Sequence, residues 1–170
     1  MDPIKFANKI DKTDVAILKI LQEDATTSNT KIAKELGMVP SAILERIRKI
    51  ESKGIIKQYQ AVLNPEKIKL PMVVFTNIKV NVSNWSKECE EELLAIENVE
   101  EIHEVVGFDS YILKIRVKDM DDLSSILKDK IGVIPEVATT QSTMVIKTLR
   151  DRGSLPLHNV GKEGKDRKAK

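Results

Sequence analysis

Cysteine and histidine are scarce in this sequence, which holds one cysteine and two histidines in 170 residues. A single thiol excludes an internal disulfide framework, and without a second cysteine it cannot build a cysteine-based metal site. His103 and His158 have no further His or Cys at metal-ligand spacing, so no metal site is expected. Cys89 is expected to be an inert helix residue, and one free cysteine fits a reducing cytoplasm.

Long apolar runs and export signals are also lacking. No apolar run approaches the roughly 20 residues that span a bilayer, and the N-terminus has no charged-then-apolar signal pattern. We therefore expect a soluble protein of the cytoplasm with no membrane partner.

Motifs of catalysis are absent as well. The sequence contains no phosphate-cradling glycine loop, no nucleophile elbow and no obvious acid/base pair. We therefore expect no enzymatic activity, no catalytic residues and no cofactor.

Charge is present but unevenly distributed, although the formal net charge is only +2. Residues 1–63 carry 11 Lys/Arg against 8 Asp/Glu, residues 64–150 carry 11 against 15, and residues 151–170 carry 6 against 3. Phosphate binding depends on locally clustered cations, so a polyanion is expected to meet the two ends of the chain.

The first part of the chain predicts three short helices. Asp11 is a capping residue for a helix over 12–23, with Asp14 in its first turn. Ser28 caps a second, short helix that Gly37 ends in a left-handed conformation. Pro40 suits the first turn of a third helix, over 40–53, which Gly54 stops.

The third helix divides into an apolar stripe and a free face. Ile43, Ile47 and Ile50 recur at spacings of four and three, which is typical of a buried helix face. The other faces carry polar and basic residues, and three short helices with a basic last one match the helix-turn-helix plan.

After the third helix the periodicity changes. Residues 55–71 alternate and then meet two prolines, which predicts a hinge strand followed by a linker. The next segments predict strands over 72–82, 99–106, 110–118 and 136–148, with helices over 85–97 and 120–130. The order β-α-β-β-α-β is the ferredoxin-like arrangement. Residues 151–170 are too polar to bury themselves, so they form an exposed tail or dock through Leu155-Pro156-Leu157.

The helical part carries a longer motif. Residues 40–56 read PSAILERIRKIESKGII. This run resembles the S-x-V-x-x-R-I-x-x-L-E-x-x-G-I-I helix of the Lrp/AsnC (feast/famine) family of prokaryotic transcription regulators, with Arg46, Glu51 and Gly54 aligned. The resemblance continues through the hinge, the βαββαβ order and Val106-Gly107, and covers roughly residues 10 to 150.

The resemblance implies an α+β fold: an N-terminal winged-type helix-turn-helix domain and a C-terminal ferredoxin-like domain. We expect the DNA-binding domain over 1–54, the hinge over 55–71, the effector-binding and dimerising domain over 72–150, and the tail over 151–170. The implied function is sequence-specific binding of double-stranded DNA, modulated by a small effector such as an amino acid. The alternative is a metabolite-sensing module whose helices serve only assembly.

Residues for each site follow from the motif. The expected DNA-binding residues lie at the start of the second helix and on the third, namely Ser28, Ser41, Ala42, Leu44, Glu45, Arg48 and Lys49. Arg46 either holds a phosphate or pairs internally with a carboxylate such as Glu51. Val39 stands where the family often has a capping serine, so the third helix loses that cap.

The expected effector site lies in the second domain, at Gly107, Asp109, Ser110, Tyr111, Gln141 and Thr143. The family loop reads Gly-x-Tyr/Phe-Asp-Tyr, whereas here the acidic residue stands one place earlier and Ser110 takes its position. This shift predicts weak or altered amino-acid specificity. The alternative is that residues 107–110 form only a hairpin turn.

Apolar residues on both faces of the third expected strand predict self-association. Tyr111, Leu113, Ile115 and Val117 point opposite to Ile112, so the face without helices also needs cover. We therefore expect a homodimer, or a tetramer or octamer built from dimers.

Overall fold

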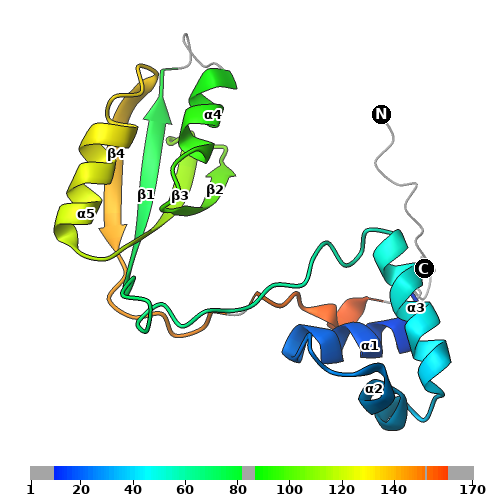
Figure 1. The fold of residues 1–170 in the computed structure, drawn as a ribbon. Coiled ribbons are helices and arrows are strands. Elements are labelled where there is room, and N and C mark those ends of the chain that lie inside the picture. The colour runs from blue at the N-terminus through cyan, green and yellow to red at the C-terminus, as the bar shows by residue number, and fades with distance from the viewer. Residues whose placement is uncertain (1–9, 82–86, 152, 161–170) are drawn as a thin grey trace, which may run out of the picture. The chain divides into compact units, whose positions relative to one another are not determined.

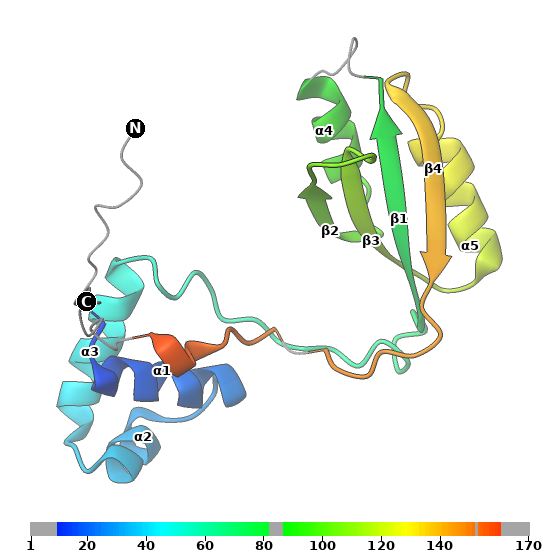
Figure 2. The ribbon, with the colours of Figure 1, turned by 180° about the vertical axis from the view of Figure 1, so that it is seen from behind.

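The structure is a computed structural model that describes residues 10–81, 87–151 and 153–160. The chain divides into two compact units (Figures 1 and 2). The first unit combines residues 1–62 with residues 151–170, and the second comprises residues 63–150. The second unit is therefore inserted between two parts of the first.

The first unit is built on three helices: α1 (Lys12–Glu23), α2 (Asn29–Leu36) and α3 (Pro40–Ser52). A short 3-10 turn, η3 (Leu157–Asn159), is contributed by the C-terminal segment. The helices enclose one apolar cluster, which consists of Ile17, Ile32, Ala33, Ile43 and Ile47. Ile43 and Ile47 belong to the apolar stripe predicted for the third helix, and the three predicted helices are confirmed.

The helix ends follow the predicted caps. The Asp11 carboxylate accepts from the Asp14 amide at 2.8 Å, and the Asp14 carboxylate accepts from the Asp11 amide at 3.2 Å. The Ser28 hydroxyl accepts from the Lys31 amide at 3.3 Å. Gly37 ends α2 with φ at +65°, a conformation that side chains with a Cβ rarely adopt. Together these local signals set where α1 and α2 begin and end.

The hinge does not form a strand within this chain. Residues 53–71 contain no strand, so neither the hinge strand nor a wing is present in the described residues. Val62 is almost fully exposed and Leu63 is largely exposed, and no neighbouring strand pairs with either of them. A segment in which apolar and polar residues alternate forms a strand only where a second strand offers hydrogen bonds to its backbone, and residues 55–63 have no such neighbour here.

The second unit is a four-stranded antiparallel sheet with helices on one side (Figures 1 and 2). Its strands are β1 (Met72–Val80), β2 (Val99–Glu104), β3 (Tyr111–Val117) and β4 (Val137–Met144), in the order β2-β3-β1-β4. The helices are α4 (Lys87–Leu94) and α5 (Met120–Ser125), and α5 continues into the π-helical turn η2 (Ile126–Ile131). This confirms the ferredoxin-like order.

The core of the second unit lies between the sheet and its helices. β3 alternates strictly, with Tyr111, Leu113, Ile115 and Val117 buried against the helices. The register places Val74, Thr76 and Ile78 of β1 on the same face. Within the second unit, no described helix or strand covers the opposite face of the sheet. None of the described helices is long and apolar enough to cross a membrane.

Several predicted boundaries were wrong. β2 ends at Glu104 rather than Val106, because the Val105 amide turns to the Ser110 carbonyl at 2.9 Å and closes the loop. β4 ends at Met144 rather than Thr148. The predicted start of α4 at Trp85 lies outside the described residues.

Candidate functional site

The free face of α3 is the first candidate site. Ser41, Glu45, Arg48 and Lys49 are exposed, Leu44 is exposed at 37%, and Ala42 is half-buried. These positions lie opposite the buried stripe of Ile43, Ile47 and Ile50. The structure therefore gathers every predicted residue of α3 on one accessible side of one helix. Ser28 is also exposed, but its hydroxyl is already the cap of α2.

The two basic residues of this face are available for a ligand. Within the described residues neither the Arg48 nor the Lys49 side chain has an ion-pair partner. A cation without an internal partner breaks no ion pair when it binds a phosphate.

The N-terminus of α3 lacks a side-chain cap, as predicted from Val39. Val39 has extended backbone angles, φ −88° and ψ 145°, and its side chain is 61% exposed. The amides of Ala42 and Ile43 both turn to the Val39 carbonyl, at 3.1 and 3.3 Å. Backbone bonds therefore replace part of what a capping hydroxyl would supply.

Arg46 is half-buried and pairs within the helical unit instead of joining the free face of α3. Its Nη1 atom lies 2.7 Å from Asp11 Oδ2 and 2.7 Å from Asp14 Oδ1. Hydrogen bonds to these two carboxylates raise the pKa of the Arg46 guanidinium above its ordinary value. Internal pairing is thus confirmed, although the suggested partner was wrong.

Glu51, the partner suggested for Arg46, instead accepts a hydrogen bond from the Tyr59 hydroxyl at 2.8 Å. Burial is the larger cause and the hydrogen bond to the Glu51 carboxylate the second, and together they raise the pKa of Tyr59 to about 12. The contact ties the first residues of the connecting segment to the end of α3.

The loop between β2 and β3 is the second candidate site. Its end is fixed to β1 by Ser110, whose amide donates to the Ile78 carbonyl at 2.8 Å and whose hydroxyl accepts from the Val80 amide at 3.1 Å. Asp109 accepts from the Asn77 side-chain amide at 3.0 Å. The Lys79 ammonium lies 4.1 Å from the centre of the Phe108 ring, a cation–π contact. The loop is a hairpin connection whose shape is held by β1.

Gly107 is not required by the chain's own packing. Its φ lies outside the left-handed region, and a Cβ placed on it would meet nothing within 4 Å. The side of the loop that Gly107 presents is therefore open space.

Asn77 joins the loop to β4, and sequence reasoning missed it. Its register partner on β4 is Gln141, while Thr143 stands opposite Phe75 on the same face. Side chains directly opposite on neighbouring strands lie within about 5.5 Å at Cβ. Asp109, Asn77, Gln141 and Thr143 therefore share the face of the sheet that has no helix. The only feature of the sequence that could have indicated this role is a polar asparagine within a strand whose other positions are mostly apolar.

Tyr111 lies apart from this group. It is buried on the helix side of the sheet, and its hydroxyl donates to Glu90 Oε1 at 3.2 Å. There it lines a hollow of about 200 Å³ together with Glu90, Leu93, Leu94, Ile102 and Glu104. Ser142 also points to the helix side, where its hydroxyl meets that of Thr76 at 2.9 Å.

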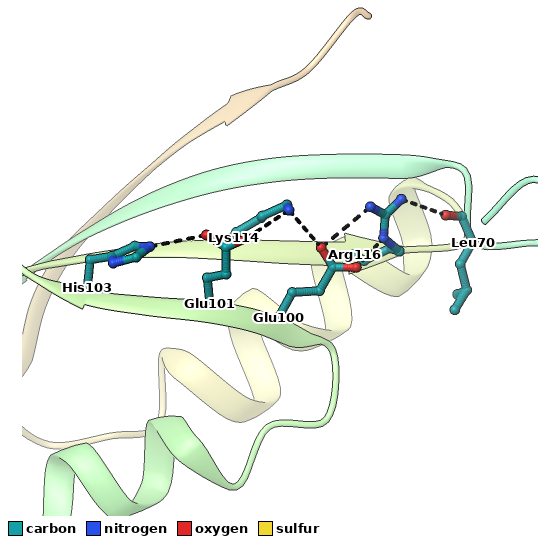
Figure 3. A network of polar contacts seen from close by, with 6 residues as sticks. All are labelled: Leu70, Glu100, Glu101, His103, Lys114 and Arg116. Atoms are coloured by element: carbon teal, nitrogen blue, oxygen red, sulfur yellow. Dashed lines mark hydrogen bonds and ion pairs between the residues drawn. The ribbon is translucent and has the colours of Figure 1, made fainter. Parts of the chain in front are cut away.

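An ion-pair network covers another part of the open sheet face (Figure 3). Lys114 lies 2.9 Å from Glu101 and 3.3 Å from Glu100, and Arg116 pairs with Glu100 and donates to the Leu70 carbonyl at 3.4 Å. The hydrogen bonds that Lys114 donates to Glu101 and then to Glu100 raise the pKa of Lys114. Burial acts to raise the pKa of Glu100, but its two basic partners outweigh burial and lower it.

Apolar side chains lie on the same open face as this network. Val73 and Phe75 of β1 and Ile112 of β3 point to this side, and Phe75 is 40% exposed.

Among the described residues no three His, Cys, Asp or Glu side chains gather as metal ligands do.

Comparison with known proteins agrees with both halves of this arrangement. A model of the AsnC-type helix-turn-helix domain matches residues 10–51, and a model of the Lrp/AsnC ligand binding domain matches residues 73–155. The HTH-type transcriptional regulator FL11 of Pyrococcus abyssi is 36% identical over 148 residues, which cover 87% of this chain and 97% of that protein. The chain belongs to the Lrp/AsnC family.

Other Lrp/AsnC proteins match over similar lengths. The leucine-responsive regulatory protein of Haemophilus influenzae is 32% identical over 156 residues, covering 90% of this chain and 94% of that protein. A solved structure of a transcriptional regulator from Neisseria meningitidis, in complex with L-Met, has a TM-score of 0.82 and 29% identity, covering 88% of this chain and 97% of its own. This Lrp/AsnC chain is a DNA-binding transcription regulator, and a module that only senses is not supported.

Proposed function

We propose that this regulator binds double-stranded DNA by placing the free face of α3 in the major groove. The observation that carries the proposal is the single stripe of exposed polar and basic side chains on α3, opposite its buried isoleucines. Residues near the start of such a helix reach base edges, so Ser41, Ala42, Leu44 and Glu45 read bases. Arg48 and Lys49 hold phosphates, and the Ser28 hydroxyl, which accepts from the Lys31 amide, still has its own proton to donate to a phosphate oxygen.

Arg48→Ala tests this assignment. Each phosphate contact contributes a slope of about −0.9 to the dependence of log affinity on log salt, so the variant should flatten the slope by about one unit. The measurement is fluorescence anisotropy of labelled duplexes at several salt concentrations. A changed sequence preference with an unchanged slope would mean that Arg48 reads a base.

The proposal includes a homodimer formed through the open face of the sheet. Phe75 and the half-buried Ile112 supply apolar area on this face, and ion pairs beside them already satisfy Lys114 and Arg116. Burying charges that are already paired within one subunit costs less desolvation free energy than burying isolated charges. Two copies meeting by a twofold axis would cover both faces, and such dimers can assemble further into tetramers or octamers.

The proposal also includes a small effector of the amino-acid class, bound beside the loop over 107–110. The solved Neisseria relative holds L-Met, which supports this class of ligand. Asp109 binds Asn77 through one carboxylate oxygen and leaves the other for an ammonium group. Hydroxyl and amide donors for a carboxylate come from Ser110, Gln141 and Thr143. The open space beside Gly107 gives room for the ligand, while Tyr111 anchors the end of the loop.

Isothermal titration against the twenty amino acids tests the effector site. We expect binding of at least one of them to weaken about tenfold or more in Asp109→Ala, because an ammonium group loses its charged partner. Asp121→Ala, an exposed carboxylate on α5, is the matched control and should bind normally. Binding that survives both Asp109→Ala and Ser110→Ala would show that this loop is not the pocket.

A further inference from the structure

Strand β4 forms one edge of the sheet, so half of its backbone groups face away from β1 (Figures 1 and 2). The register identifies which half. The Val145 amide donates to the Val73 carbonyl at 2.9 Å, so these two residues are a hydrogen-bonded pair. Such pairs alternate along an antiparallel ladder with pairs that exchange no bond. The residues of β4 whose amide and carbonyl turn outward are therefore Met144, Ser142 and Thr140.

The side chains of β4 agree with this assignment. Ser142 stands opposite Thr76 of β1, and their hydroxyls meet at 2.9 Å. Side chains approach most closely in the pairs that exchange no backbone bond. Among the described residues, no strand or side chain bonds to the three outward positions, and the side chains from Ala138 to Met144 are exposed. The outer edge of β4 is therefore open.

The two edges of the sheet differ in how they are protected. Charged residues, prolines and bulges protect most sheet edges, because an open edge pairs readily with another strand. Three of the six residues of β2 are glutamates, and its register with β3 shifts between Val99 and Glu101. Residues 137–146, in contrast, contain no charged residue, proline or glycine, and the register shift of β4 affects only its start at Val137. The β4 edge is thus the one that can accept another strand.

The strand that suits this edge is β4 of a second copy. With a twofold axis at Ser142, this residue faces its own copy and Thr140 faces Met144, so every outward amide meets an outward carbonyl. Like charges opposite each other are unfavourable, whereas threonine and serine side chains form favourable cross-strand pairs. An uncharged strand can therefore pair with itself, while self-pairing of β2 would bring two glutamate-rich edges together.

We propose that the β4 edges of two subunits pair antiparallel about a twofold axis and join two four-stranded sheets into one continuous sheet. This interface uses the backbone edge, whereas the proposed homodimer uses the open face of the sheet, so one subunit can form both. Dimers joined through a second twofold interface form a tetramer or a larger assembly. The inference rests on the proposed homodimer only for the size of that assembly.

Hydrogen exchange resolved to single amides tests the pairing in the unaltered protein. In the assembled protein, the amides of Thr140, Ser142 and Met144 should exchange about tenfold or more slowly than after dilution to separate the subunits. The amides of Gln141 and Thr143, which turn to β1, are the internal control and should be protected at both concentrations. Outward amides that exchange freely in the assembled protein would leave this edge to a partner of another kind and overturn the proposal.

Thr140→Pro tests the interface by mutation. Proline removes the outward amide of this residue, and an edge strand tolerates proline where the missing N–H faces away from the sheet. Analytical ultracentrifugation should show the mass fall from that of a tetramer or larger assembly to that of a dimer. The matched control is Thr140→Val, which keeps the amide and should keep the wild-type mass. Circular dichroism checks that Thr140→Pro is folded, and Met144→Lys places a charge on the edge without removing a backbone bond.

Combination with Phe75→Asp separates this interface from the proposed homodimer. If Phe75→Asp lowers the mass while Thr140→Pro and Met144→Lys leave it unchanged, the β4 interface is refuted and the homodimer on the open face stands. If only the two β4 variants lower the mass, the β4 interface stands and the homodimer on the open face is refuted. A dimer in each single variant and a monomer in the double variant is the result expected from both interfaces.

Discussion

At the scale of single residues, Arg46 determines how α3 is held against α1. Its guanidinium joins two carboxylates that also cap α1, so one side chain connects a helix start to the middle of another helix. Arg46→Ala should lower the free energy of unfolding by about 1 kcal/mol, a modest value because the pair is partly exposed and screened by solvent. Urea unfolding measures this effect. Arg48→Ala, on the free face of the same helix, should leave stability unchanged.

The effect of Arg46→Ala should depend on pH. The hydrogen bond from the Asp14 amide, and then Arg46, lower the pKa of Asp11 below its ordinary value of 3.8. A carboxyl group with a lowered pKa contributes stability above its unfolded value, and this contribution is lost as the pH falls through the folded value. The stability difference between wild type and Arg46→Ala should therefore be full at neutral pH and shrink below pH 3.8. An equal difference at acid pH would show that packing, rather than the ion pair, is responsible.

Residue partners were the part of the site least accessible from the sequence. Spacing indicates which residues share a helix face, but Arg46 meets Asp11 from 35 positions away. Likewise Asn77 reaches Asp109 only because β1 and β3 pair in one particular register. Such contacts depend on tertiary geometry, which no local pattern specifies.

At the scale of elements, the uncapped start of α3 offers a test of the local physics. Val39 already has the extended backbone of a capping residue and is largely exposed, so a serine there needs no rearrangement. Val39→Ser should raise the free energy of unfolding by about 0.5–2 kcal/mol. Ser28→Ala, which removes the existing cap of α2, should lower it by a similar amount. Unchanged urea midpoints in both variants would contradict this account of the helix starts.

Elements with strong local signals were predicted well, and those that depend on neighbours were not. The bounds of α1 follow from Asp11 and the apolar spacing, and they match the prediction. The π-helical turn after α5 was missed because apolar periodicity does not distinguish it from an α-helix. Gly132 caps that turn: its amide donates to the Leu127 carbonyl at 2.8 Å, and a Cβ there would lie only 2.9 Å from the same oxygen.

At the scale of the whole molecule, the open sheet face makes self-association testable. Phe75→Asp places a charge at the centre of the proposed dimer interface, where its burial is strongly unfavourable. Analytical ultracentrifugation at micromolar concentration should show a dimer or larger assembly for wild type and a shift toward monomer for this variant. Leu94→Asp, an exposed apolar position on α4, is the control and should not dissociate the assembly. A monomeric wild type at this concentration would contradict the proposed dimer.

DNA binding by the whole chain is the central claim, and filter binding with random duplex DNA tests it most directly. The protein's net charge is only +2, so strong binding must come from the clustered cations of the helical unit rather than from overall charge. We predict measurable binding at low salt that weakens steeply as salt rises, with a log–log slope of about −0.9 for each phosphate contacted. Absence of binding to any duplex at low salt would contradict the account.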